Sequence, residues 1–392
     1  MLGHIRRTAR VGPLAGAALA IALAAAACTP PPSDPAPPGP PSVSGFRLVA
    51  ERDAAPVVGV LRWNVSDPNR DQLTCSVDSD GDGTTDEVIS PCTSASSVLV
   101  QIDDPGAYSA SIEVTDGEFP AVTADLSETI APAPAEDFGI TLRLDPGMDP
   151  VFAQSFQDAA ARWSEVITAG VPDVTADIPA GLVGWNPAFS GTIDDVLIDA
   201  RDTAIDGPGG VLGQAGGILV RNGPWQPYYG IMQFDTADLA ALASQGRLDD
   251  VILHEMAHVL GVGPSWVLTG RITDLLTDPR YTGPAGVAAW RELGGSGYVP
   301  VENDGELGTV LGHWRESVFG DELMTGYLGA APTVLSRLTV AALADQGYGV
   351  DLGAAEPYSL PGFALRAGPG GQTGLLLDVE QIPPLAPTAS AG

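Results

Sequence analysis

The hydrophobic pattern divides the chain into two parts with different periods. Between residues 43 and 131, short runs such as VVGVLRWNV and YSASIEV alternate apolar and polar positions, and turns rich in Gly, Asp and Pro separate them. A period of two indicates strands with one buried face, and the regular spacing of these strands predicts an antiparallel β-sandwich. A Pro/Ala stretch at 131–137 ends this pattern and marks a domain boundary.

Helical and strand patterns alternate between residues 137 and 353. We expect a strand at GITLRL and then a helix that begins at Asp149 and Pro150 and ends before Gly170. Apolar residues recur at helical spacing within it: Phe152, Phe156, Ala160, Trp163 and Ile167. Strand-like runs follow at DVLIDA, GGILVR and GIMQF, ahead of a second helix within 248–263. The expected fold class is therefore multidomain, an immunoglobulin-like β-sandwich followed by an α+β domain.

The first 42 residues show the pattern of an export signal and a tether. Residues 1–27 combine an Arg-rich start with an Ala/Leu-rich apolar run, and small residues precede Cys28. This arrangement predicts lipidation of Cys28 and a lipoprotein of the bacterial cell envelope, anchored to the membrane through its lipid; ordinary signal cleavage nearby is the alternative. Residues 28–42 hold a proline-rich spacer that would extend ~40 Å at about 3.1 Å per residue.

Net charge excludes one class of function. The chain of 392 residues carries 18 Arg, no Lys and 49 acidic residues, a formal net charge of −31. Such a surface repels the phosphates of nucleic acid, so no nucleic-acid partner is expected.

The cysteine count predicts one disulfide. The chain has three cysteines, an odd number for an exported protein. If Cys28 is acylated, Cys75 and Cys92 remain as a pair in an oxidising compartment, where they would close a short loop.

The stretch DSDGDGTTD offers a second kind of chemistry. Asp78, Asp80, Asp82 and Asp86 alternate around a turn glycine, as the oxygen ligands of a calcium loop do. The twelfth position of such a loop is Ile89, where a bidentate glutamate is usual. A Ca²⁺ site and a solvated acidic turn therefore both remain open.

The helix within 248–263 carries the strongest motif, HEMAH. His254 and His258 lie one helical turn apart, so their imidazoles can bind one metal ion. Glu255 is rotated by about 100° from His254, which places it beside an open coordination position and not on it. There it would act as a general base on a water bound to Zn²⁺.

A complete zinc site needs a third protein ligand. Because His4 leaves with the signal, the histidine that remains is His313, 55 residues after His258. Gly261 follows the motif at the position where a glycine can end the helix and turn the chain sharply. We expect His254, His258 and His313 to bind one zinc ion.

These motifs resemble the leishmanolysin-like branch of the metzincin metalloproteases. The resemblance rests on HEMAHVLGVG, GHWRESVFGDELMTG and LSRLTVAALADQGY, and it covers about residues 137–353. It implies that His313 is the third zinc ligand and that Met324 is the methionine of the turn beneath the metal. Residues 43–131, with the closing VTDG, resemble PKD or cadherin-like modules. Residues 354–392 form a tail rich in Gly and Pro.

The function expected from these features is an extracytoplasmic zinc metalloendopeptidase. A protein or peptide substrate would add a strand along an edge near Gly213 to Val220. The alternative is a surface adhesion or scaffold protein whose protease-like domain does not cut and whose sandwich binds a surface ligand. Glu255 favours the enzyme, because a purely structural zinc site has no use for an acid beside an open position.

Overall fold

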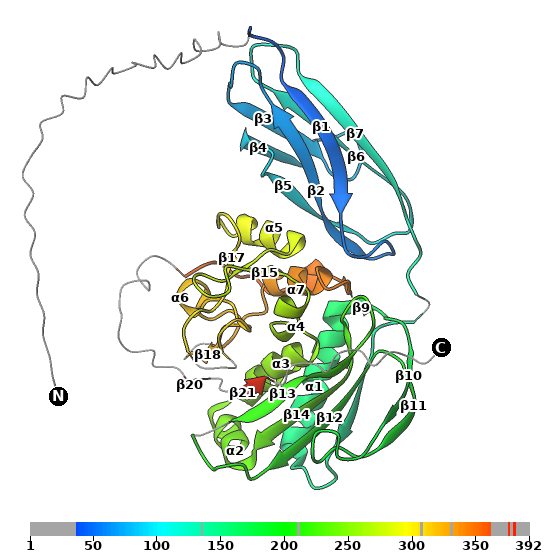
Figure 1. The fold of residues 1–392 in the computed structure, drawn as a ribbon, viewed down its shortest axis with the longest axis vertical. Helices are drawn as coiled ribbons and strands as arrows, with labels where there is room; N and C mark the ends of the chain where they lie inside the picture. The colour runs from blue at the N-terminus through cyan, green and yellow to red at the C-terminus, as the bar shows by residue number, and fades with distance from the viewer. Residues whose placement is uncertain are drawn as a thin grey trace, which may run out of the picture.

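The protein is described by a computed structural model. It describes residues 37–134, 136–209, 212–305, 309–329 and 332–361, and the backbone of 375–376 and 379–381. An all-β part extends from Ser42 to Ile130, and a larger part with helices and strands begins at β8 (Ile140–Leu144). Figure 1 shows the all-β part standing at one end of the larger part. The chain is a β-rich multidomain protein, as the change of period predicted.

The strands of the N-terminal part lie in two antiparallel sheets. One sheet has the order β1-β2-β5 and the other the order β4-β3-β6-β7. The strands are β1 (Ser42–Val49), β2 (Val57–Ser66), β3 (Leu73–Asp78), β4 (Glu87–Cys92), β5 (Ser97–Ile102), β6 (Gly106–Thr115) and β7 (Val122–Ile130). Every second residue of β3 is buried, as the alternating pattern requires. Side chains from both sheets, including Trp63 and Ile112, share one core.

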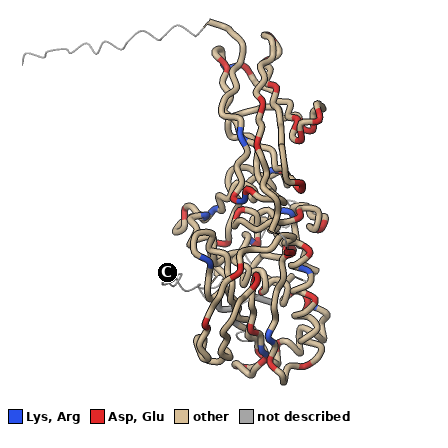
Figure 2. Tube along the Cα trace, turned by 90° about the vertical axis from the view of Figure 1, so that its right-hand side faces the viewer, with Lys and Arg blue, Asp and Glu red and all other residues tan. Residues whose placement is uncertain are grey.

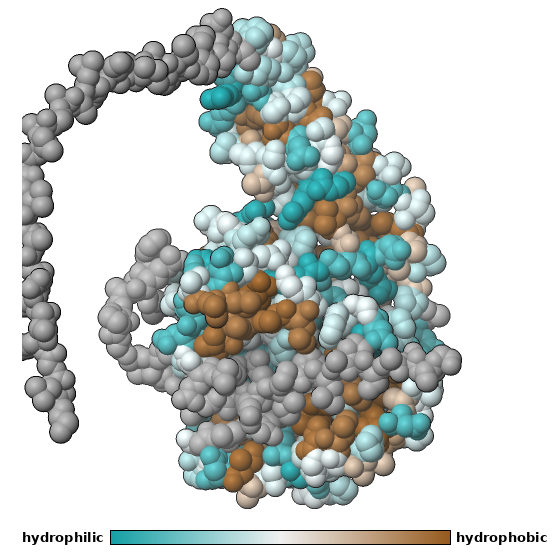
Figure 3. Space-filling view, viewed as in Figure 1, coloured by the Kyte–Doolittle hydropathy of each residue, from teal (hydrophilic) through white to brown (hydrophobic). Residues whose placement is uncertain are grey.

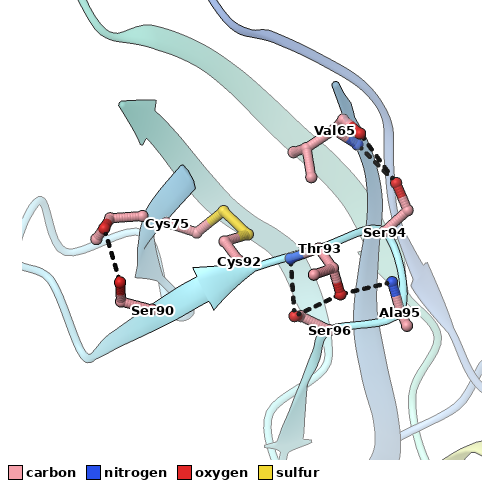
Figure 4. The surroundings of a disulfide bond; sticks show 9 residues. Val65, Cys75, Ser90, Cys92, Thr93, Ser94, Ala95 and Ser96 are labelled. Carbon is pink, nitrogen blue, oxygen red and sulfur yellow. Dashed lines mark hydrogen bonds between the residues drawn. A yellow bond between two sulfur atoms is a disulfide. The ribbon is translucent and has the colours of Figure 1, made fainter. Parts of the chain in front are cut away.

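The predicted disulfide between Cys75 and Cys92 is present within this sandwich. Cys75 lies in β3, and Cys92 is the last residue of the neighbouring strand β4 (Figure 4). Their Cα atoms are 5.6 Å apart, and both residues belong to the sandwich core. Closing a loop of this size reduces the entropy of the unfolded chain, which stabilises the fold by about 3 kcal/mol in the chain-entropy account.

A five-stranded sheet organises the larger part, in the order β21-β13-β14-β12-β8. Strands β8, β12 (Val196–Thr203) and β14 (Pro227–Asp235) are parallel, whereas β13 (Gly213–Val220) is antiparallel to β14. Strand β21 (Val379–Gln381) pairs with residues 213–215 of β13 in the parallel direction. The strand predicted as an edge is therefore covered over its first three residues by the C-terminal part of the chain.

Helix α1 (Pro150–Val166) packs beside α3 (Leu248–Val259) and contributes to the same core. As predicted, α1 begins after Asp149, whose side chain accepts a hydrogen bond of 2.8 Å from the Val151 N–H. The helix stops at Val166, three residues earlier than the spacing allowed, because Ile167 is extended and opens β9 (Ile167–Ala169). The indole of Trp163 donates to the carbonyl of Leu253 over 3.0 Å and joins the two helices.

Shorter elements complete the larger part. The helices are α2 (Thr236–Gln245), α4 (Pro264–Leu268), α5 (Pro284–Glu292), α6 (Glu316–Phe319), α7 (Arg337–Ala344) and the 3₁₀ turn η1 (Leu352–Ala354). The paired strands are β10 (Val174–Ile178) with β11 (Phe189–Ile193), β15 (Ile272–Thr273) with β16 (Arg280–Tyr281), β16 with β17 (Val299–Pro300), β18 (Tyr327–Leu328) with β20 (Leu375–Leu376), and β9 with β19 (Gly349–Val350).

Polar contacts dock the sandwich on the larger part. Arg291 at the end of α5 donates to the carbonyl of Ala95 over 2.7 Å, and the N–H of Leu352 donates to the Gln101 side chain over 2.7 Å. Val58 of β2 belongs to the core of the larger part and not to the sandwich core. The two parts are therefore packed against each other and not joined by the 131–137 stretch alone.

Acidic residues are distributed over both parts of the chain. Figure 2 shows Asp and Glu spread along the whole described trace, with Arg scattered among them. The face drawn in Figure 3 also carries an apolar area where Figure 1 places the loops around α6 and β17. One helical stretch, Leu248–Leu268, is apolar and long enough to cross a membrane by composition, but 78% of its most apolar window is buried inside the fold. This stretch is the core helix that carries the HEMAH motif.

Candidate metal centre

Helix α3 holds His254, Glu255 and His258 in the interior of the larger part. Its N-cap is Arg247, which makes no side-chain hydrogen bond to the helix, and Asp249 and Asp250 follow it. Both acids lie in the first turn, where a negative charge is favourable beside the helix N-terminus. The apolar side chains of Met256, Ala257 and Leu260 on this stretch are buried.

The structure brings together the three histidines that the sequence singled out. The Nε2 atoms of His254 and His258 are 3.0 Å apart, and His313 Nε2 lies 3.1 Å and 3.0 Å from them. Three nitrogens at about 2.0–2.1 Å from a tetrahedral zinc ion would be about 3.3 Å from one another. The three ring nitrogens are thus within a few tenths of an ångström of the spacing that zinc requires.

Backbone carbonyls set the orientation of each ring. His254 Nδ1 donates to Leu323 O over 2.6 Å, His258 Nδ1 to Val262 O over 2.8 Å, and His313 Nδ1 to Thr309 O over 2.9 Å. In a neutral imidazole, a proton on Nδ1 leaves a lone pair on Nε2. All three lone pairs therefore face the same point, which is the arrangement that a metal-binding histidine needs from its surroundings.

Burial keeps these rings neutral. Each of the three side chains is 1% exposed. Burial, and for His254 also the proximity of His313, lowers the pKa of His254 to about 3, and burial lowers the pKa of His313 to about 4. Burial likewise lowers the pKa of His258 well below its ordinary value. The ligands are thus unprotonated at neutral pH, as metal binding requires.

Glu255 lies beside this cluster without a partner. Its side chain is 0% exposed, and neither carboxylate oxygen has a hydrogen-bond partner among the described residues. Oε1 is 3.9 Å from His254 Nε2, beyond hydrogen-bond reach. Burial raises the pKa of this carboxyl well above its usual range. A buried acid with free oxygens is costly in a purely structural role, and its position suits a group that exchanges a proton beside a bound cation.

Two glycines shape the turn after α3. Gly261, at the predicted helix-ending turn, has φ 104°, a backbone conformation that side-chain-bearing residues rarely adopt, and a Cβ there would lie 2.5 Å from Gln346 Oε1. Gly263 has φ 88°, and its Cβ would lie 2.2 Å from the carbonyl oxygen of Gly312, the residue before His313. Gly263 was not predicted to matter from the sequence, because the close contact is between Gly263 and Gly312, which are 49 positions apart.

Met324 lies in a buried turn next to the carbonyl that orients His254. It is 0% exposed, and its carbonyl accepts a hydrogen bond of 2.9 Å from the N–H of Trp314. The residue before it, Leu323, supplies the oxygen bonded to His254. The turn therefore contacts both segments that carry histidines, one through His254 and the other through the neighbour of His313.

The acid that holds this turn was not among the residues predicted from the sequence. Glu322 is 0% exposed, and its carboxylate accepts hydrogen bonds from Met324 N (2.6 Å), Ser336 Oγ (2.7 Å) and Thr339 Oγ1 (2.5 Å). The one signal in the sequence was the acid pair Asp321 and Glu322 between apolar residues in VFGDELM. Ser336 stands at the N-cap position of α7, but its hydroxyl donates to Glu322 and makes no helix cap.

Other residues near the motifs have structural surroundings. Trp266 and Trp314 are 0% exposed, and their ring centroids are 4.3 Å apart, so they pack in the core. Asp345 at the end of α7 accepts from the N–H groups of Ala285 and Gly286, both over 2.9 Å.

The predicted substrate edge is only partly available. Residues 213–215 of β13 pair with β21, so within the described residues the outer edge of β13 is unpaired over 216–220. This stretch lies against α3, because a Cβ at Gly217 would be 3.0 Å from the carbonyl oxygen of Val259, the neighbour of His258. The edge expectation is therefore corrected to the second half of the strand.

The acidic loop of the sandwich does not support the calcium interpretation. Carboxylate oxygens of Asp78, Asp80 and Asp82 come within 4.8 Å of one another, but Asp86 turns away and accepts hydrogen bonds from Ser79. Both Asp78 oxygens already accept backbone N–H groups of the loop, at 2.7 Å and 2.9 Å. The solvated acidic turn accounts for these contacts. Three further acids, Asp67, Asp71 and Asp116, form a similar group that the sequence did not suggest.

The predicted lipidation site, Cys28, lies outside the described residues, as does the signal in residues 1–27.

Comparisons with known proteins agree with the geometry. Residues 223–360 match the family model of Peptidase_M8, described as leishmanolysin, a range that includes the three histidines, Glu255 and Met324. A leishmanolysin homolog from Crithidia fasciculata is 30% identical over 134 residues, and that alignment covers 31% of this chain and 20% of the relative. The chain thus matches about a fifth of that relative's length. The predicted resemblance to leishmanolysin is confirmed over this segment, which matches a family of metallopeptidases.

Solved PKD domains match about a quarter of the chain. The PKD1 domain of Vibrio anguillarum Epp is 16% identical with a TM-score of 0.19, and covers 24% of this chain and 96% of its own. The PKD domain of an M14-like peptidase from a Thermoplasmatales archaeon is 24% identical with a TM-score of 0.19, and covers 24% of this chain and 98% of its own. The two-sheet architecture of the sandwich is shown by the pairing of its own strands.

Proposed function

Because residues 223–360 match leishmanolysin, we propose that this chain is a zinc-dependent metalloendopeptidase of the metzincin type, with a protein or peptide substrate. The observation that carries the proposal is the convergence of three unprotonated Nε2 atoms, 3.0–3.1 Å apart, beside a buried acid with no other partner.

The residues fit a catalytic zinc ion. Three histidine nitrogens are a common set of protein ligands for catalytic zinc, and they leave one coordination position for water or substrate. His254, His258 and His313 would hold the ion, and their Nδ1 bonds to backbone carbonyls would keep the rings in place. When bound, zinc lowers the pKa of a coordinated water to about 7 and polarises a carbonyl oxygen.

Glu255 would move the proton. Its carboxylate follows His254 on the helix and has no other hydrogen-bond partner among the described residues, so it is available to a water beside the histidines. In its ionised form it takes a proton from that water, and it then donates the proton to the nitrogen of the leaving amine. Removing such a base costs typically 10²–10⁴-fold in rate.

An extended peptide would bind along residues 216–220 of β13, the part of this edge that no described strand pairs with. Backbone groups of residues 216–220 offer hydrogen bonds to main chain, which is how an edge strand recognises a peptide with loose side-chain preference. The close packing of Gly217 on Val259 brings this edge next to the helix turn of His258. Proline substitutions within 216–220 that leave the fold intact should therefore raise KM for long peptides.

We also propose an extracytoplasmic location. The support is the signal-like pattern of residues 1–27, the small residues before Cys28 and the proline-rich spacer after it. Incorporation of labelled fatty acid into the full chain, and its loss in Cys28→Ser, tests the lipid anchor.

Cleavage of an unfolded protein by the parent and by Glu255→Gln, with zinc measured on both, tests the enzyme. Asp250→Asn on the same helix is the matched control, because it removes a carboxylate that pairs with Arg247 at the other end of α3. We expect zinc in all three proteins and a loss of at least ~10²-fold in cleavage for Glu255→Gln alone. Zinc in the parent without cleavage would favour the adhesion or scaffold function.

A further inference from the structure

Behind the metal centre, a buried carboxylate joins two segments of chain. Glu322 accepts hydrogen bonds from the N–H of Met324 on one side and from the hydroxyls of Ser336 and Thr339 on the other. Ser336 and Thr339 belong to the first turn of α7, and Met324 to the turn beneath the histidines. No cation pairs with Glu322 within the described part of the chain. Hydrogen bonds and the N-terminus of α7 are what compensate the burial of this acid.

The contacts of Glu322 lead to two of the histidines. The peptide bond between Leu323 and Met324 carries the Leu323 carbonyl, which accepts the Nδ1 proton of His254 over 2.6 Å. Because the carboxylate holds the N–H of Met324, it fixes the plane of the peptide whose oxygen is that carbonyl. A rotation of this peptide would withdraw the oxygen from His254.

The second connection runs through Thr339. Its hydroxyl donates to Glu322 and accepts a hydrogen bond of 2.8 Å from the indole of Trp314. Trp314 follows His313 directly, and its N–H donates to Met324 O over 2.9 Å. The same carboxylate is therefore linked, through one hydroxyl, to the residue next to His313.

We propose that Glu322 is a positioning residue of the metal centre, which holds the Leu323 carbonyl and Trp314 so that His254 and His313 present their Nε2 atoms to the same ion. This inference rests on the proposed metal site but not on catalysis. Partners that orient metal-binding histidines typically contribute 10–100-fold to metal affinity, so loss of Glu322 should speed the release of zinc by a factor in that range.

Asp345 provides a matched control at the other end of α7. It is also a buried acid, and it accepts from two backbone N–H groups and from the hydroxyl of Tyr281 at 3.0 Å. None of these partners is hydrogen-bonded to the Leu323–Met324 peptide or to Trp314; Tyr281 contacts Trp314 by ring packing alone, with centroids 5.4 Å apart. Asp345→Leu should therefore destabilise the fold as Glu322→Leu does, without changing the orientation of the zinc ligands.

The experiment measures the rate at which a chromogenic chelator removes zinc from the full chain at a temperature where each variant is folded. We expect Glu322→Leu to lose zinc at least ~10-fold faster than the parent, and Asp345→Leu less than ~2-fold faster. Glu322→Gln should stay near the parent, because its amide oxygen still accepts from Met324 N and its NH₂ can donate to a hydroxyl. If Glu322→Leu does not fold, Thr339→Val removes one link to the carboxylate and one to Trp314 and should show a smaller acceleration.

Histidine ¹⁵N NMR of the metal-bound chain separates positioning from stability. The Nδ1–H signal of His254 should shift in Glu322→Leu and stay in place in Asp345→Leu. Equal zinc loss in the two leucine variants, or an unmoved His254 signal, would overturn the proposal. A parent that binds zinc but cuts no peptide would refute the proposed enzyme and leave this test intact, whereas a parent without zinc affinity would refute both.

Discussion

His254 donates its Nδ1 proton to the carbonyl oxygen of Leu323 over 2.6 Å, a contact between residues 69 positions apart. This hydrogen bond decides which nitrogen of His254 is free for a metal, because a ring with its proton on Nδ1 has its lone pair on Nε2. The motif on the helix places the ring, and a turn from a distant segment selects its tautomer.

Zinc should stabilise the folded chain, because a metal that binds only the native state shifts unfolding by mass action. At a free zinc concentration 100 times the Kd, we expect a gain of about 2.7 kcal/mol in the free energy of unfolding. His313→Gln removes one of three ligands and should abolish most of this gain. Thermal unfolding with zinc and with chelator measures it. An unchanged zinc response in His313→Gln would exclude His313 as a ligand.

Gly263→Ala should damage the metal centre, whereas Gly270→Ala should only strain the backbone. Both glycines have positive φ, 88° and 68°. A Cβ at 263 would lie 2.2 Å from Gly312 O and push apart the segments that carry His258 and His313, but a Cβ at 270 meets nothing within 4 Å. We expect about 1–2 kcal/mol of destabilisation at 270 and more at 263. Faster zinc release at 263 alone is the distinguishing result, and equal behaviour would contradict it.

The stability change caused by Asp345→Asn should depend on pH. Burial raises the pKa of Asp345 to about 6, above its ordinary 3.8. The native state therefore holds the proton more tightly than the unfolded chain, so the stability gained from Asp345 is complete below pH 3.8 and is lost as the pH rises through 6. Asparagine has no such proton. We expect the variant to lose on the order of 2–3 kcal/mol more at pH 4 than at pH 8 in denaturant unfolding with chelator present. An equal loss at both values would count against this ionisation.

Shortening the chain after Pro361 should ease substrate binding. Strand β21 pairs with residues 213–215 of β13, and β20 pairs with β18, which begins directly after Gly326 beside His313. The backbone of residues 375–376 and 379–381 therefore pairs with the strand next to Gly326 and with the first part of the edge of β13. We expect a lower KM for an unfolded protein substrate in the shortened chain, and a similar change in the full chain with Glu380→Pro, which removes a backbone N–H. An unchanged KM in both would show that β21 and the substrate do not compete.

Removing the sandwich should destabilise the rest of the chain. Arg271 pairs with Glu51 at 2.5 Å, Arg291 bonds the backbone at Ala95, and Val58 packs in the larger core. A chain that begins at residue 137 should unfold at a lower temperature than the full chain, because it exposes this apolar contact. Glu51→Gln, which removes only the ion pair, should cost less than ~1 kcal/mol. An unchanged melting temperature after the deletion would mean that the contact contributes little.

The local pattern was enough for the elements that form from neighbours in the sequence. A period of two predicted the antiparallel strands of the sandwich, and the cysteine count predicted the pair Cys75 and Cys92. The start of α1 at Asp149 and Pro150 was also predicted, because a cap is a contact within one turn of helix. Its end was not, because β9 forms with a strand near residue 350. The same limit applies to the edge of β13, which β21 covers from the far end of the chain.

By itself, the sequence determined the chemical groups of the candidate site. The candidate residues could be identified because histidine is rare in this chain. His254, Glu255 and His258 occupy one turn of a helix, and His313 follows 55 residues later. Tertiary structure alone decided how those groups are oriented. The carbonyl of Leu323 and the carboxylate of Glu322 come from a turn that reaches the helix only in the folded state. Hydrogen bonds between distant segments depend on three-dimensional packing, and a linear pattern carries no record of which backbone oxygen will face which ring.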